Sequence, residues 1–235
     1  ALGFELRRFK TGTPPRLHRA SLALERLEAQ GGDPEPRPFS WRSRAVANRA
    51  LCWLSRTPPA VRAIIEDNLH RSPLYAGRIE GIGPRYCPSI EDKVVRFPHH
   101  ETHTVFLEPE ELAGDSIYLN GLSTSLPADV QELVVRAVPG LERAVFLRYG
   151  YAVEYDVVAP RQVAPTLESR AVPGLFVAGQ LLGTSGYEEA AALGLVAGIN
   201  AVRGLRGEAA FVADRAEAYL GVLVDDVCGR EHREP

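Results

Sequence analysis

Two segments of the chain carry apolar residues at helical spacing. The first follows two prolines and has its apolar positions at Val61, Ile64, Ile65 and Leu69. The second begins at Ser125-Leu126-Pro127, stops at Pro139-Gly140 and has its apolar positions at Val130, Leu133, Val134 and Ala137. Proline suits the first turn of a helix, so the pattern predicts two helices, each with one buried face.

Other segments follow the shorter period of strands. Val94, Val95 and Phe97 precede a polar stretch and then residues 105–107, which predicts a hairpin with a loose turn. Residues 145–158 also indicate strands. The run Lys10 to Arg16 contains two prolines and predicts a turn at a domain junction. Residues 28–44, rich in Gly, Pro and Arg, predict an exposed linker.

A strand, glycine-rich turn and helix are expected near the C-terminal end. Residues 174–179 predict a short apolar strand, and Gly183 and Gly186 lead into a long helix. Such turns offer helix amides to an anionic ligand. One face of this helix has only small side chains, so something must approach it closely, either a cofactor or a tightly packed neighbour: Ala190, Ala191, Gly194, Ala197 and Gly198.

Composition indicates a globular chain of 235 residues with a net charge of −3. No stretch approaches the roughly 20 apolar residues of a membrane span, and no signal peptide is evident, so we expect a cytoplasmic protein. The chain has no methionine, and both ends suggest a piece of a longer protein. Arg42, Arg44 and Arg49 form a basic run, as do Arg7 to Arg19; a solvated face is commoner for such runs than a phosphate-binding patch.

Cys87 lies in a run crowded with turn formers and reactive side chains. A lone cysteine is usually structural, and a nucleophilic thiolate would need cations such as Arg85 or Lys93 beside it. Ser89 and Asp92 have capping-box spacing, although the residues after them resemble a strand. Both interpretations of Cys87 stay open at this point.

The remaining cysteines and the histidines do not predict chemistry. Cys52 has apolar neighbours that favour burial, and the three cysteines form no short-spaced pair. His99, His100 and His103 fall in the expected turn without ligand spacing, so we predict no metal site.

Five ordered motifs resemble the glucose-inhibited division protein A family. They are Phe9 to Arg16, Gly83 to Phe97, Asn120 to Pro127, Gly150 to Asp156, and Gly179 to Asn200. The resemblance implies an enzyme that uses FAD, NADH and methylene-tetrahydrofolate to build an aminomethyl or carboxymethylaminomethyl group at C5 of the tRNA wobble uridine. It also implies a GTPase partner of the MnmE type and a homodimer.

The resemblance also implies the site residues. Gln180 would contact FAD, and Cys87 would be one of two thiols that take part in the chemistry. The NAD site would comprise Gly83, Pro84, Arg85, Tyr86, Cys87, Pro88, Ser89, Ile90, Glu91, Asp92, Lys93, Val94, Val95, Arg96 and Phe97.

The family fold implies an α/β chain: a partial FAD-binding Rossmann-like domain with a smaller inserted α/β domain. Residues 1–13 and 149–205 would belong to the FAD domain, 14–148 to the NAD-binding insertion, and 206–235 to the start of a helical C-terminal region. The Gly-x-Gly-x-x-Gly turn is absent here, so this part alone should bind FAD weakly or not at all. Trp53-Leu54, Leu182 and Leu193 depart from the family pattern.

Two alternatives differ in class or in reaction. One is the related folate- and FAD-dependent tRNA uridine methyltransferase, which the motifs Lys10 to Arg16 and Gly83 to Lys93 disfavour. The other is a noncatalytic nucleotide- or RNA-binding module, which the missing flavin motif would suit.

Overall fold

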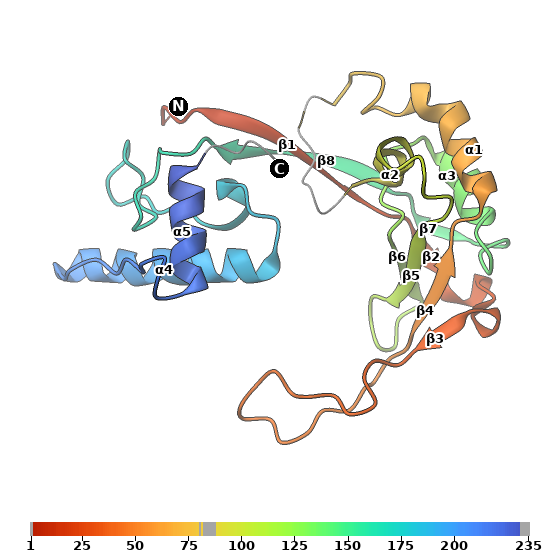
Figure 1. The fold of residues 1–235 in the computed structure, drawn as a ribbon, viewed down its shortest axis with the longest axis horizontal. Coiled ribbons are helices and arrows are strands. Elements are labelled where there is room, and N and C mark those ends of the chain that lie inside the picture. Colours follow the sequence, from red (N-terminus) through yellow and green to blue (C-terminus); the bar gives the residue numbers. More distant parts are fainter. Residues whose placement is uncertain (1, 80, 82–87, 231–235) are drawn as a thin grey trace. The chain divides into compact units, whose positions relative to one another are not determined.

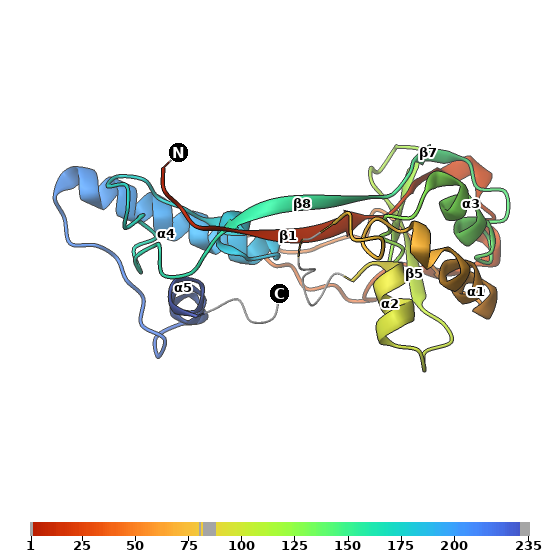
Figure 2. The ribbon, with the colours of Figure 1, turned by 90° about the horizontal axis from the view of Figure 1, so that it is seen from above.

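The computed structural model describes residues 2–79, 81 and 88–230, and these residues divide into two compact units. The first unit holds residues 2–10, 81 and 154–230, and the second holds 11–79 and 88–153. The boundary falls within two strands, β1 (Leu6–Thr13) and β8 (Tyr151–Val158), which pair in a two-stranded sheet (Figures 1 and 2).

The second unit is built on a six-stranded antiparallel sheet in the order β3-β4-β5-β6-β2-β7. Its strands are β2 (Arg16–His18), β3 (Glu28–Gln30), β4 (Cys52–Arg56), β5 (Thr104–Pro109), β6 (Ser116–Asn120) and β7 (Phe146–Arg148). Buried and less buried residues alternate along β5, where Val105 and Leu107 are fully buried. This alternation is the period of a sheet with one face against a core.

Three helices complete that core: α1 (Pro59–Asn68), α2 (Ile90–Arg96) and α3 (Ala128–Arg136). Both helices expected from apolar spacing are confirmed as α1 and α3. Val61 and Ile65 of α1 are buried, as are Val130 and Val134 of α3, whereas Leu133 is exposed. Short 3-10 turns lie at Arg19–Ser21, Leu24–Arg26 and Leu69–Arg71.

The predicted hairpin from Val94 is wrong, because Ile90–Arg96 forms α2. Ser89 Oγ accepts a hydrogen bond from the Asp92 amide at 3.2 Å, and Asp92 Oδ2 accepts one from the Ser89 amide at 3.2 Å. This capping box satisfies free amides of the first turn and outweighs the strand preference of two valines. Val94 is buried and Val95 is exposed, as on one helical face. β5 pairs instead with β4 and β6.

In the first unit, the expected strand at 174–179 is also wrong, since the segment forms only an isolated bridge between Glu168 and Phe176. A 3-10 turn (η4, Gly179–Leu182) follows, and then α4 (Tyr187–Arg206), which confirms the expected long helix. Asn200 of α4 is buried and donates to the carbonyls of Thr166 and Phe211 at 3.0 and 2.9 Å. These bonds hold α4 to its neighbours.

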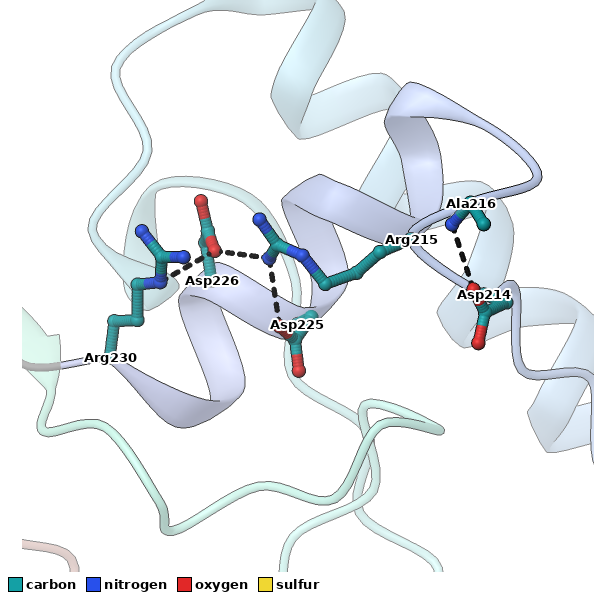
Figure 3. Close-up of polar contacts among 6 residues, drawn as sticks. All are labelled: Asp214, Arg215, Ala216, Asp225, Asp226 and Arg230. Atoms are coloured by element: carbon teal, nitrogen blue, oxygen red, sulfur yellow. Dashed lines mark hydrogen bonds and ion pairs between the residues drawn. The ribbon is translucent and has the colours of Figure 1, made fainter.

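The first unit ends in α5 (Tyr219–Gly229), which packs on α4 with Val224 and Cys228 buried. Figure 3 shows Arg215 donating to Asp225 at 2.8 Å and to Asp226 at 2.5 Å, while Arg230 pairs with Asp226 at 3.0 Å. Exposed ion pairs of this kind are screened by water and contribute little, so the buried apolar face of α5 is what holds it in place.

The second unit should depend strongly on its sheet core. Leu119→Ala removes a fully buried side chain of β6 and should lower the free energy of unfolding by about 2–5 kcal/mol, because a cavity is added to the lost burial. Urea denaturation of the full-length protein measures the change. Leu147→Ala, at a 52% exposed position in β7, is the matched control and should shift stability by less than about 0.5 kcal/mol. Equal effects of the two changes would contradict the assigned core.

Candidate functional site

The predicted flavin contact, Gln180, lies exposed in η4 of the first unit. Gly179 and Gly183 flank the turn with φ of +69° and +88°, a region that side chains with a Cβ rarely adopt. These two glycines shape a tight backbone turn directly before α4. Gln180 therefore stands at a fixed turn with its side chain free to contact a ligand.

Thr184 supports a ligand at this turn, although the sequence motifs did not single it out. Its hydroxyl Oγ1 is buried and has no hydrogen-bond partner among the described residues. A buried hydroxyl without a partner is costly, so an oxygen or nitrogen from outside these residues is expected to bond to it. The Gly-Thr-Ser-Gly run at 183–186 was the only sequence signal that could have indicated it.

The N-terminus of α4 offers less to an anion than the sequence suggests. Glu189 Oε2 accepts from the Gly186 amide at 2.7 Å, and Glu188 adds a second carboxylate to the first turn. These carboxylates already occupy the positive end of the helix dipole. The turn itself, with the exposed Gln180 and the unpartnered hydroxyl of Thr184, therefore offers more to a ligand than the helix amides do.

The two glycines on the small-residue face of α4 have no close neighbour within the described chain, although Ala190 of the same face lies close to Gly179. Gly194 and Gly198 are exposed, and no atom lies within 4 Å of where their Cβ would be. Of the predicted set, Ala197 is the buried member. Tight packing inside the described residues therefore does not account for the two glycines.

The predicted NAD segment is described from Pro88 to Phe97 and lies in the second unit. The first five residues of the segment lie outside the described residues: Gly83, Pro84, Arg85, Tyr86 and Cys87. Cys87 carries the predicted catalytic thiol. Pro88 directly precedes α2, whose capping residue is Ser89. Gln180 and Pro88–Phe97 thus belong to different units.

Glu91 is the most deeply buried charged side chain of this segment, with no exposed surface. Its Oε1 accepts hydrogen bonds from the Ser125 amide at 2.9 Å and from Ser125 Oγ at 3.2 Å, and Ser125 Oγ lies 3.2 Å from the buried Ser72 Oγ. The other oxygen, Oε2, has no partner among the described residues. The carboxylate ties α2 to the loop before α3 and leaves one acceptor unused.

A second set of contacts holds Asp92. Tyr75 donates its hydroxyl to Asp92 Oδ1 at 3.3 Å, and burial, followed by the Asp92 charge, raises the pKa of Tyr75 to about 12. The phenol therefore stays protonated at neutral pH and acts as a donor. Lys93 Nζ donates to the Gly121 carbonyl at 2.9 Å, which turns this cation toward the loop ahead of α3.

The two described thiols are not activated. Burial raises the pKa of Cys228 to about 11, and its Sγ donates to the Ala164 carbonyl at 3.3 Å. Burial and then Glu108 raise the pKa of Cys52. Nucleophilic thiols need the opposite shift, so neither residue suits that role. The described residues contain no group of three His, Cys, Asp or Glu suited to a metal ion, and no helix among them could cross a membrane.

The chain is similar to several known proteins. The family model described as Glucose inhibited division protein A matches residues 1–209. An enzyme of Desulfitobacterium hafniense named tRNA uridine 5-carboxymethylaminomethyl modification enzyme MnmG is 54% identical over 241 residues, covering 100% of this chain and 38% of its own. The namesake from Bacillus velezensis is 52% identical, with 100% and 37% covered.

Solved structures match as well. Aquifex aeolicus GidA in its form I crystal has a TM-score of 0.90 at 48% identity, covering 100% of this chain and 40% of its own. The form II crystal gives 0.88 at 45%. These matches confirm the expected fold class, an α/β chain with a partial Rossmann-like FAD domain. The chain spans about two fifths of the length of these relatives.

The Glu91 contacts lead to a stability prediction. Glu91→Leu keeps the volume but removes the acceptor of the Ser125 amide, and should lower the free energy of unfolding by about 1–3 kcal/mol. Glu91→Gln retains an oxygen acceptor and should lose less. Urea denaturation of the full-length protein compares the two. A Gln variant that is as unstable as the Leu variant would show that the hydrogen bonds to Ser125 are not what matters.

Proposed function

Because this chain belongs to the glucose-inhibited division protein A family, we propose that it is part of an enzyme that modifies tRNA at C5 of the wobble uridine, adding an aminomethyl or carboxymethylaminomethyl group. The observation that carries the proposal is the match of the entire chain to relatives named for this modification. The activity is assigned to the whole protein, of which this chain corresponds to about two fifths.

The cofactors follow from the same family. FAD is proposed at the η4 turn, where the exposed Gln180 and the unpartnered hydroxyl of Thr184 would hold it. FAD supplies redox chemistry when bound, with NADH as the reductant and methylene-tetrahydrofolate as the carbon donor. Donors held by a tight backbone turn are preorganised, so they need little rearrangement when a cofactor binds.

Each domain predicted from the sequence has a proposed role. Residues 1–13 and 149–205 are assigned to the FAD domain, 14–148 to the domain that binds NADH, and 206–235 to the start of a helical region. The NADH site is proposed at Gly83 to Phe97. Among the described residues of this segment, the capping box at Ser89 and the buried Glu91 hold the start of α2 in place. A GTPase of the MnmE type and a second copy of the protein are the proposed partners, in the cytoplasm.

Cys87 is proposed as a catalytic thiol, and its replacement tests the function directly. Cys87→Ser in the full-length protein should abolish modification of the wobble uridine, because a hydroxyl is a far weaker nucleophile than a thiolate. Mass spectrometry of nucleosides from tRNA of cells carrying only the variant measures the loss. The same analysis distinguishes an aminomethyl or carboxymethylaminomethyl uridine from a methyluridine by mass, which separates this function from a methyltransferase.

The matched control is Cys52→Ser. Cys52 is partly buried in β4, and its raised pKa makes it a poor nucleophile, so the control should modify tRNA at the normal level. Normal modification by Cys87→Ser would remove that thiol from the mechanism. Loss of modification in both variants would point to a general loss of structure instead.

The flavin contact has its own test. Gln180→Leu removes the amide of an exposed side chain without affecting the core, and should lower the amount of FAD that co-purifies with the full-length protein. Flavin absorbance relative to protein absorbance measures this ratio. Leu181→Ala, at the neighbouring exposed position, is the control. A Gln180→Leu protein with full flavin content and unchanged FAD affinity would place the cofactor elsewhere.

A further inference from the structure

The segment between β3 and β4 forms a long arm, residues 31–51, that projects from the sheet of the second unit (Figure 1). Asn48 closes its base by donating its side-chain amide to the carbonyls of Gly31 and Asp33. Prolines at 34, 36 and 38 restrict φ along the outgoing limb and cannot donate hydrogen bonds. The arm is therefore an exposed projection that is closed at its base.

Two large aromatic side chains lie near the middle of the arm sequence with no protein surface over them. Phe39 and Trp41 have relative exposures of 108% and 102%. A turn presents them, because the Ser43 amide donates to the Ser40 carbonyl at 3.0 Å and the Arg42 amide donates to Ser40 Oγ at 3.2 Å. Two exposed aromatic rings this close in sequence can stack on a partner with flat apolar surfaces.

The same arm is basic. It carries Arg37, Arg42, Arg44 and Arg49 against two acids, Asp33 and Glu35, and no acid follows Glu35 before β4. None of the four guanidinium groups makes an ion pair with any residue in the described parts of the chain. Four unpaired cations so close together favour an anionic partner.

A pocket of about 340 Å³ lies at the base of the arm, lined by Arg19, Asn48, Arg49 and Leu112 among others. Arg19 stacks over the ring of the buried Trp53, with 5.3 Å from its guanidinium carbon to the ring centroid. This stacking holds one guanidinium in place on the wall of the pocket. Two guanidinium groups with donors available form a suitable site for a phosphate.

We infer that the arm binds a single-stranded segment of RNA, with unpaired bases stacked on Phe39 and Trp41 and a backbone phosphate held between Arg19 and Arg49. Bases splayed from a loop offer the flat faces on which aromatic side chains stack. The backbone phosphates supply the negative charges that would pair with the arginines. The inference rests on the proposed function, which makes the RNA the tRNA substrate. A phosphate-rich partner fits better than a protein, because residues 36–51 contain four arginines and no acid.

The test uses the full-length protein and an end-labelled anticodon stem-loop RNA, with a blunt RNA duplex of equal length for comparison. Phe39→Ala/Trp41→Ala should weaken binding of the stem-loop on the order of tenfold or more and leave duplex binding nearly unchanged. Fluorescence anisotropy measures both affinities. Tryptophan emission should also be quenched by the stem-loop in the wild type, and less so in Trp41→Phe.

The arginines have a separate readout. Replacing Arg37, Arg42, Arg44 and Arg49 with Gln should weaken binding of both RNAs and reduce the slope of log affinity against log salt by about 0.7 for each phosphate that the variant no longer neutralises. Two controls remove an exposed apolar side chain and an exposed arginine outside the arm: Leu133→Ala on α3 and Arg143→Gln. Both controls should bind the stem-loop like the wild type.

Several outcomes would overturn the inference. Arm variants that bind the stem-loop with wild-type affinity and salt slope would do so, since the RNA then binds elsewhere. So would arm variants that change the sedimentation coefficient or the thermal stability of the protein, because the arm would then dock on protein. Arm-dependent flotation with phosphatidylglycerol vesicles, without an effect on RNA binding, would assign the arm to a membrane surface.

The outcomes also separate the inference from the proposed function. A wild-type protein that binds no tRNA would remove both. Loss of activity in Cys87→Ser with intact tRNA binding would leave the inference about the arm unchanged.

Discussion

The burial of the Glu91 carboxylate is the constraint on which the proposed NADH site depends. A carboxylate with no exposed surface must be hydrogen-bonded, and Ser125 provides both donors at the start of the α3 segment. The capping box at Ser89 fixes the same N-terminal end of α2 through hydrogen bonds within the segment. Two polar anchors and the apolar pair Ile90 and Val94 thus determine where α2 begins, directly after Pro88.

The sheet of the second unit explains why an arm can project from it. One face of the sheet is covered by α1, α2 and α3, and its outermost strands, β3 and β7, are three residues long. Short edge strands discourage unwanted pairing with other chains. The chain leaves the sheet after β3 and returns at β4. The arm therefore adds mainly the entropy cost of closing a loop, and the hydrogen bond from Asn48 at the base shortens that loop.

In the first unit, several groups lack partners within the described chain. Thr184 Oγ1 is buried without a hydrogen bond, and the α4 face bearing Gly194 and Gly198 is open. Both features lie on the stretch that begins with Gln180. They agree with a chain that corresponds to about two fifths of its relatives' length, and with a cofactor proposed at the same turn.

Local patterns in the sequence determined the elements whose signals were strong. Helical spacing predicted α1 and α3, the glycine turn predicted the start of α4, and ordered motifs predicted the family. Tertiary structure decided what local preference left ambiguous. Val94 and Val95 favour a strand, yet capping at Ser89 and a buried acceptor for Ser125 made α2 a helix. Which of Phe39, Trp53 and Trp41 would be buried was likewise undetermined, because burial depends on neighbours that only the folded chain brings together.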